Sequence, residues 1–309
     1  MVNTFVTPDV IARQALVSLR EQLVMQQLVY TDITSDFASA RVGDTINVRK
    51  PAVFTSKKFD RAAGIEIQDA TESKVPVKLD QFDTVDFEVT SEDFMLEIDD
   101  LDERLITPAA FAIATGVDQQ ILTLRNDITQ EVGVVTAGDP FRGRPYSDPR
   151  VLIGAGGVLN AAKVPTTERR AVIGVGTHAS WLDTDDLQHA EKSGSTEALR
   201  EAYLGRRLSG FDPYWTQNIA GPAAAPAVGD PTTEVGVAFH RTAFAFASAP
   251  MAVPPGANGA VETRDGLSIR VTWDYSMDRK ATVFSLDILY GVKTLDKNRA
   301  VLIKGADKA

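Results

Sequence analysis

The most informative part of the chain is residues 45–90, which read TINVRKPAVFTSKKFDRAAGIEIQDATESKVPVKLDQFDTVDFEVT. Two segments with strand-like alternation, 46–54 and 74–89, flank a charged, glycine-containing centre, and this pattern predicts one long β-hairpin. In the second arm the alternation slips at Gln81 and Asp83, which predicts a bulge or bend there. Arms of about fifteen residues reach roughly 50 Å, whereas a compact globule of this length has a radius of gyration of about 20 Å. The hairpin must therefore leave its own globule. Because a lone two-stranded ribbon is marginally stable and exposes hydrogen-bonding edges, we expect it to lie on a neighbouring subunit.

The centre of the hairpin carries basic residues that we expect to contact a neighbouring subunit: Lys57, Lys58 and Arg61. An acidic run follows further along the chain: Glu97, Asp99, Asp100, Asp102 and Glu103. Clustered carboxylates can share protons in hydrolases, but acids before a helix also complement the helix dipole, and this second interpretation is the stronger one. Opposite charges at separate positions suit a head-to-tail contact between identical subunits, so the acidic run is the candidate docking surface for the hairpin tip.

A long apolar stripe begins after Pro108 and recurs at three- and four-residue steps as far as residue 128. It predicts a helix of about twenty residues with an apolar face. The expected buried face contains Phe111, Val117, Ile121 and Leu124. Helices are also expected over 10–30 and 147–163, and a mixture of short helices and strands follows from residue 170 onward. The fold class is therefore α+β, with strands expected at 171–175, 208–215, 235–239, 243–247, 267–275, 282–292 and 300–304.

Composition limits the function classes. The 309 residues are 44% hydrophobic and 24% charged, which is typical of globular proteins, and no cysteine is present. Disulfide frameworks, thiolate zinc sites and cysteine nucleophiles are thus excluded, as in a protein made in a reducing cytoplasm. The sequence contains no leader-like start and no apolar run near the roughly 20 residues that span a bilayer, so no membrane contact is expected. The net charge of −10 disfavours a protein that coats phosphates but permits a container for DNA.

A search for catalytic motifs finds no phosphate-binding loop, HExxH, GxSxG or EF-hand pattern. The best metal or acid–base candidate is the cluster of Asp183, Asp185, Asp186 and His189, since a carboxylate and an imidazole on one helical face suit a divalent ion. A solvated helix end is the more ordinary interpretation, because few ligands from one surface turn seldom hold a metal. His240, between two expected strands, is expected to pack or cap. We expect no cofactor, no metal and no enzymatic reaction.

The order of these segments resembles the major capsid proteins of tailed bacteriophages. The resemblance is carried by residues 195–219 (STEALREAYLGRRLSGFDPYWTQNI), 238–251 (AFHRTAFAFASAPM) and 283–305 (VFSLDILYGVKTLDKNRAVLIKG) together with the amino-terminal half, and it covers nearly the whole chain. It implies an N-terminal arm at 1–40, an extended loop at 41–92 and a peripheral domain with a spine helix at 93–149. An axial domain at 150–270 and closing strands at 271–309, which return toward the peripheral domain, would complete the chain.

The resemblance implies that pentamers and hexamers of the chain form an icosahedral shell around a double-stranded DNA phage genome. The expected partners are a portal, a decoration protein and DNA held by non-specific contact. Because the arm begins almost at Met1, a separate scaffolding protein is also implied. Some relatives cross-link a loop lysine to an asparagine before the closing strands, but 275–280 contain no asparagine, so we expect no such cross-link. The protein would be made in the host cytoplasm and reside in the virion.

Two other functions remain open at this stage. The first is the shell of a bacterial nanocompartment of the same fold, which encloses cargo enzymes. The second is a metal-dependent hydrolase that uses the Asp183–His189 cluster.

Overall fold

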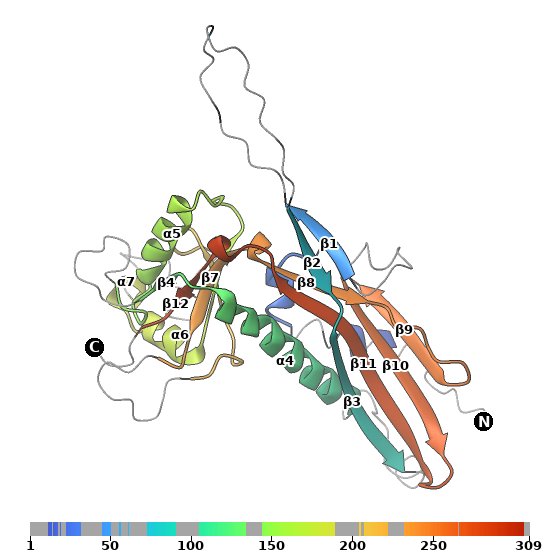
Figure 1. Ribbon diagram of the computed structural model, residues 1–309. Coiled ribbons are helices and arrows are strands. Elements are labelled where there is room, and N and C mark those ends of the chain that lie inside the picture. Colours follow the sequence, from blue (N-terminus) through green and yellow to red (C-terminus); the bar gives the residue numbers. More distant parts are fainter. Residues whose placement is uncertain are drawn as a thin grey trace.

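Two separate β-sheets and a projecting hairpin organise the chain (Figure 1). The computed structural model describes residues 12–31 (except 14, 18 and 20–22), 45–50, 56, 61, 73–90, 105–133, 144–188, 204, 207–221 and 232–305 (except 265). A compact unit of sheet and short helices lies beside a long, narrow sheet that extends away from it, and the hairpin leaves near the junction (Figure 1).

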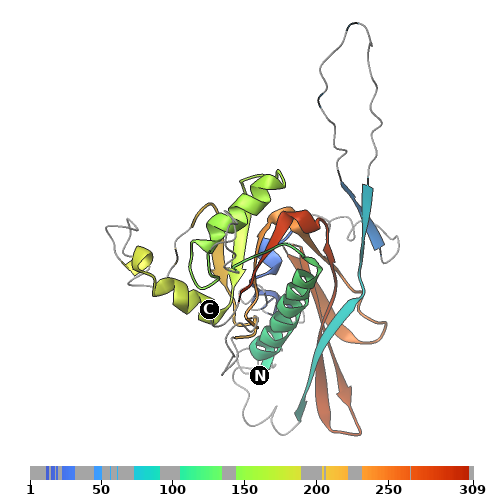
Figure 2. The same cartoon turned by 60° about the vertical axis from the view of Figure 1, so that its left-hand side comes forward.

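The long sheet is antiparallel and has the order β3–β11–β10–β9. It consists of β3 (Gln81–Thr90), β11 (Ala281–Thr294), β10 (Leu267–Ser276) and β9 (Asn258–Arg264), and β8 (Phe244–Ala249) pairs with the last part of β11. The helix α4 (Thr107–Thr123), continued by the 3-10 turn η3 (Leu124–Asp127), crosses one face of this sheet (Figure 2). Strand β9 was not expected from the sequence, because its NGAVETR segment is largely polar.

The compact unit contains a second, mixed sheet with the order β4–β12–β7–β5–β6. Its strands are β4 (Glu131–Val132), β12 (Ala300–Ile303), β7 (Gly236–His240), β5 (Arg169–Ile173) and β6 (Asp212–Trp215). The helices α5 (Val151–Ala161) and α6 (Val175–Leu182) pack on one face, where Leu152, Leu159 and Trp181 are fully buried with Ala171 and Ile173. Helix α7 (Asp185–Gln188) follows α6. The other face of the sheet joins the core beneath α4.

The hairpin prediction is confirmed in one half and wrong in the other. Strand β1 (Thr45–Lys50) pairs antiparallel with β2 (Ser73–Lys78) in a sheet of their own. Residues 74–89 were expected to form one arm with a bulge or bend near Gln81 and Asp83. The strand is interrupted just before, at Leu79 and Asp80, and the chain then leaves the hairpin and enters the long sheet as β3. Phe87 stacks on Phe284 of β11 with ring centroids 5.4 Å apart. The apolar side chains of the second half therefore serve the protein's own sheet.

The spine helix exists, but its face was assigned with one error. Val117 and Ile121 are buried as expected, and Leu124 is partly buried in the 3-10 turn beyond the helix. Phe111, however, is 52% exposed. The buried stripe runs through Ile113, two residues further on, and two residues correspond to about 200° around a helix axis, so the two side chains lie on opposite faces. Helix α4 also ends at Thr123, earlier than the expected residue 128.

One core joins the N-terminal segment, α4 and both sheets. Residues at 12–19, where described, are helical, and Leu16, Leu19, Met25 and Leu28 are buried with the inner face of α4. The helix expected over 10–30 is confirmed for the described residues up to 19, whereas residues 23–25 are irregular and lead into a 3-10 turn η1 (Gln26–Leu28). None of the described helices is long and apolar enough to cross a membrane.

The sheets do not follow the expected sequence boundaries. Strands β8 and β9 fall within 150–270, which was expected to form the axial domain, but they belong to the long sheet. Strand β12 falls within 271–309, whose strands were expected to return to the peripheral domain, but it belongs to the compact sheet, as does β4. Both units are therefore assembled from separated segments, because sheet pairing joins residues without regard to their distance along the chain.

Candidate assembly surfaces

The base of the hairpin is fixed to the protein by a small apolar cluster. Val77 of β2 is fully buried and packs with Ala245 and Ala247 of β8 and with Leu295. Gly291 of β11 lets the joint between β2 and β3 approach closely: a Cβ at this position would meet the Lys78 carbonyl oxygen and lie 2.8 Å from its carbon. The direction in which the hairpin leaves is therefore set by backbone-to-backbone contact.

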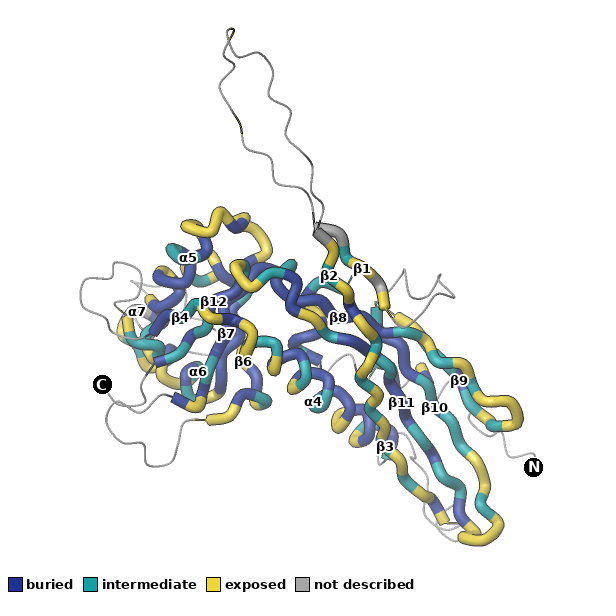
Figure 3. Tube along the Cα trace, viewed as in Figure 1, coloured by how far each residue is buried: buried dark blue, intermediate teal, exposed yellow. Residues whose placement is uncertain are grey.

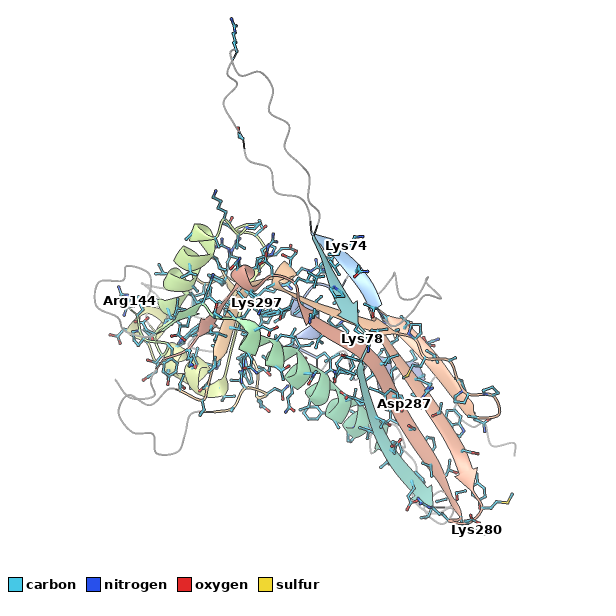
Figure 4. The ribbon with its side chains drawn as sticks, viewed as in Figure 1. Lys74, Lys78, Arg144, Lys280, Asp287 and Lys297 are labelled. Atoms are coloured by element: carbon cyan, nitrogen blue, oxygen red, sulfur yellow. The ribbon has the colours of Figure 1, made fainter. Side chains whose placement is uncertain are left out.

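The two described strands of the hairpin form a ribbon of their own, and Val48 and Val75 pack against the apolar cluster at its base. Among the described strands, β1 and β2 pair only with each other, so their outer edges have no described partner strand. Lys74 and Lys78 are exposed on β2 (Figure 4). Arg61 is exposed in a turn, as expected for a residue of the hairpin tip. Open strand edges of this kind favour pairing with, or packing on, another molecule.

The other members of the expected docking pair lie outside the described residues. These are Lys57 and Lys58 of the tip and the acidic run Glu97, Asp99, Asp100, Asp102 and Glu103. Their contact therefore stays a prediction.

A buried carboxylate ties the N-terminal segment to the spine helix. Asp118 of α4 is 1% exposed and accepts hydrogen bonds from the backbone N–H groups of Val24 (3.0 Å) and Met25 (3.1 Å). Burial raises the pKa of Asp118 to about 6, although these hydrogen bonds partly oppose the rise. The sequence offered no signal for this role, since Asp118 lies within an apolar stripe.

A buried ion pair links β10 to β11. Arg270 donates through Nη2 (2.6 Å) and Nε (2.9 Å) to Oδ2 of Asp287, and Ser285 Oγ donates to Oδ1 of Asp287 (2.9 Å). The Asp287 side chain is only 4% exposed, and it lies within the long sheet (Figure 4). The Arg270 guanidinium also reaches the carbonyl of Ala252 (3.1 Å). These contacts join β10 to β11 and to the segment that contains Ala252.

The compact unit provides little that resembles catalysis. Asp183 and Asp185 are exposed near α7, while the Asp186 side chain and His189 lie outside the described residues. Within the described part of the chain no group of three or more His, Asp or Glu side chains could hold a metal ion. His240 caps a 3-10 turn by accepting from the Thr242 N–H, which confirms its expected structural role. The glycine-bearing segment at Gly174 is a strand-to-helix turn, where Glu234 accepts from the Thr177 N–H (2.8 Å).

Large apolar side chains remain exposed on both units. Exposed residues in general lie mainly along turns and strand edges of the trace (Figure 3). Tyr275 lies near the end of β10, and Met277 (76% exposed) lies in the following turn to β11, which Lys280 marks at the far end of the long sheet in Figure 4. Val175 and Trp215 are exposed on the compact unit. Such residues mark a protein-contact surface only where they lie together, and Trp215 and Val175 both lie where β5 and β6 end.

No family model and no curated protein matches the sequence. Solved structures do match across most of the chain. A structure from Mycobacterium phage Che8 is 21% identical, covers 91% of this chain and 90% of its own, and gives a TM-score of 0.64. The capsid of Cyanophage P-SCSP1u is 10% identical over 93% and 89% of the two chains, with a TM-score of 0.57. A virus-like particle from Pyrococcus furiosus is 11% identical over 95% and 97%, with a TM-score of 0.50.

These similarities extend over both sheets and are not confined to one motif. Further matches of the same kind include the mature capsid of bacteriophage PhiM1 and the capsid of Ralstonia phage GP4. The chain therefore has the α+β fold of tailed-phage major capsid proteins, the family that the order of its segments resembles.

Proposed function

We propose that this chain is the major capsid protein of a tailed phage, and that its copies assemble into an icosahedral shell around double-stranded DNA. One observation carries the proposal: the fold is shared with capsid structures over about nine-tenths of the chain, and it includes a hairpin whose two strands pair with no third strand in the described part of the chain. Shell building requires contacts between identical copies, and a projecting ribbon is suited to make them. The role is structural, and the protein acts in the virion after synthesis in the host cytoplasm.

Pentamers and hexamers of the chain would form the shell, a portal would provide the opening for DNA, and a scaffolding protein and a decoration protein are further proposed partners. DNA inside the shell would be held without specific contacts, which agrees with the net charge of −10. The domain roles inferred from the resemblance apply here as proposals: the compact unit would gather around the symmetry axes, and the long sheet would lie at the periphery.

The runner-up is a nanocompartment shell, for which the likeness to the Pyrococcus furiosus virus-like particle is the supporting observation. The higher TM-score of the Che8 structure, 0.64 against 0.50, favours the phage capsid. The hydrolase alternative stays a prediction, because the Asp186 side chain and His189 lie outside the described residues, which form no metal-binding group by themselves.

Expression of the chain, alone and with candidate scaffolding proteins, tests the proposal. Electron microscopy should show closed particles of uniform size. Particles purified from infected cells should contain nuclease-resistant DNA, whereas a nanocompartment would contain a protein cargo. A chain that stays monomeric or forms only small oligomers under all these conditions would contradict the proposal.

The hairpin tip should dock on the acidic run of a neighbouring copy. Each exposed charge pair contributes only about 0–1 kcal/mol and is screened over roughly 8 Å at physiological salt, so repetition over the whole shell matters more than any one bridge. Changing Lys57, Lys58 and Arg61 together to glutamate should weaken assembly most at low salt, and added salt should partly restore it. Normal assembly of this triple variant at low salt would rule out the docking site while leaving the capsid proposal intact.

A further inference from the structure

An aromatic ridge projects from one end of the compact unit. It consists of Val175, His178 and Trp215, and the Trp215 ring stacks on the His178 ring with centroids 5.3 Å apart and an interplanar angle of 29°. Trp215 and Val175 are each 46% exposed. Both lie where β5 and β6 end, and β6 is the edge strand of its sheet within the described residues. Partly exposed tryptophan held in one orientation is typical of residues that anchor protein interfaces.

A groove of about 570 Å³ opens at the other end of the same two strands. Its floor is α5, where Ile153 is 61% exposed and Gly156 and Gly157 contribute no side chains. Its walls come from residues beside the starts of β5 and β6: Thr166, Arg169, Arg207, Ser209 and Gly210. The groove thus has an apolar floor and a polar rim, which is the chemistry that receives an aromatic side chain.

The wall of the groove is held in place before anything binds. Arg169 is 4% exposed, and its guanidinium donates to Asn160 Oδ1 (2.8 Å), the Val164 carbonyl (2.6 Å) and the Pro165 carbonyl (2.8 Å). Arg207 donates through Nη2 to the Thr166 carbonyl (3.0 Å), which fixes the rim. A preformed groove loses little conformational entropy on binding, so it favours a specific occupant.

The ridge of a copy cannot reach the groove of the same copy. Strands β5 and β6 are parallel, so the groove at their starts and the ridge at their ends are separated by the strand length, roughly 15 Å for about five residues. In Figures 1 and 2, α5 lies on the side toward which β1 and β2 leave the molecule, and α6 lies on the opposite side. A neighbour placed where the hairpin points would present its ridge side to this groove.

We propose that the aromatic ridge of one copy fills the α5 groove of the next copy within a ring of the shell. The contact rests on the proposed function. It is heterologous, because one surface meets a different surface of an identical chain, and repetition of such a contact closes a ring. Trp215 is the anchor residue of the contact, Ile153 and the two glycines receive it, and Arg207 lies at the rim, where a guanidinium packs well against an indole face.

Because the chain contains no cysteine, introduced thiols give a clean test. The variant Ile153→Cys/Val175→Cys has one thiol in the groove and one on the ridge, and assembled particles are treated with a short bis-maleimide. Denaturing gels should show a ladder of covalent oligomers up to the size of the ring. Each single variant should give monomers, and co-assembly of the two single variants should give dimers and nothing larger.

Dimers from a single variant, or particles of the double variant without a ladder, would overturn the contact but leave the capsid function standing. Failure of the cysteine-free parent to form particles would overturn the function and the contact together. If the cysteine pair itself prevented assembly, substitutions at Trp215 and Tyr214 test the contact instead. Trp215→Ala should raise the concentration needed for assembly about 10-fold or more, whereas Trp215→Phe and Tyr214→Ala, whose side chain lies on the other face of β6, should leave it nearly unchanged. Equal assembly of all three variants would refute the proposal.

Discussion

Replacement of Gly291 by alanine should loosen the base of the hairpin. The added Cβ would lie 2.8 Å from the Lys78 carbonyl carbon and 3.2 Å from the Leu79 Cα, and it would meet the Lys78 carbonyl oxygen. Carbon atoms in contact are ordinarily about 3.5–4.0 Å apart, so the joint between β2 and β3 must move by on the order of 1 Å. All three contacts are backbone atoms, which no side-chain rotation can relieve.

Overpacking of this kind costs about 1–3 kcal/mol. The loss corresponds to a fall of a few degrees in the midpoint of thermal unfolding for a chain of this size. Because the same contact sets the direction of the hairpin, assembly should suffer more than folding: fewer closed particles should form at a concentration where the parent assembles fully.

Gly221→Ala is the matched control, since a Cβ there would meet nothing within 4 Å. Thermal unfolding monitored by circular dichroism and particle counts from electron microscopy give the two measurements. Parent-like unfolding and assembly of Gly291→Ala, or an equal loss in Gly221→Ala, would refute the role assigned to this close approach.

Three further outcomes are expected. Ile121→Asp should make the chain insoluble, because burying an unpaired charge at a position that is 1% exposed costs several kcal/mol. Phe111→Asp, on the exposed face of the same helix, should leave the chain soluble. Equal soluble yields of the two variants would show that the buried face of α4 is wrongly assigned. The pKa of Asp118 is raised from 3.8 to about 6 in the folded chain. Between pH 3.8 and pH 6 the folded chain therefore binds a proton at Asp118 that the unfolded chain has lost. The contribution of Asp118 to the free energy of unfolding should increase as the pH falls from 6 toward 3.8. The urea midpoint of the parent should therefore rise relative to that of Asp118→Asn as the pH falls over that range, and parallel pH profiles of the two chains would contradict the raised pKa. Boiled particles should run as one band near 33.4 kDa, and a covalent ladder in the parent would contradict the expected absence of cross-links.

Much of the fold could be predicted because it depends on neighbours in the sequence. The alternation at 46–50 and 74–78 defined the paired part of the hairpin, and the three- and four-residue steps through Val117 and Ile121 located the spine helix. Most strands after residue 170 were expected near their observed places for the same reason. Strand β9 was missed because its polar residues carry little periodic signal, and its pairing with β10 decides its conformation.

The candidate surfaces were less predictable. The groove combines Ile153 and two glycines of α5 with Arg207 and Gly210, which lie about fifty residues further along the chain. No local sequence pattern predicts that these residues meet. Both glycines line the groove, and Gly156 also lies against Phe211. Trp215 and His178 likewise meet only because β5 and β6 run side by side.

By itself, the sequence determined the class of the fold, the order of its segments, the existence of the hairpin and the absence of thiol chemistry. Only the tertiary structure decided that 74–89 changes partner at Leu79, that Phe111 faces outward, and that β8, β9 and β12 cross the expected domain limits. The physical reason is the range of the interactions. Helical and strand periodicity reflects contacts between residues a few positions apart, whereas strand pairing and surface grooves depend on which distant segments the whole core brings together.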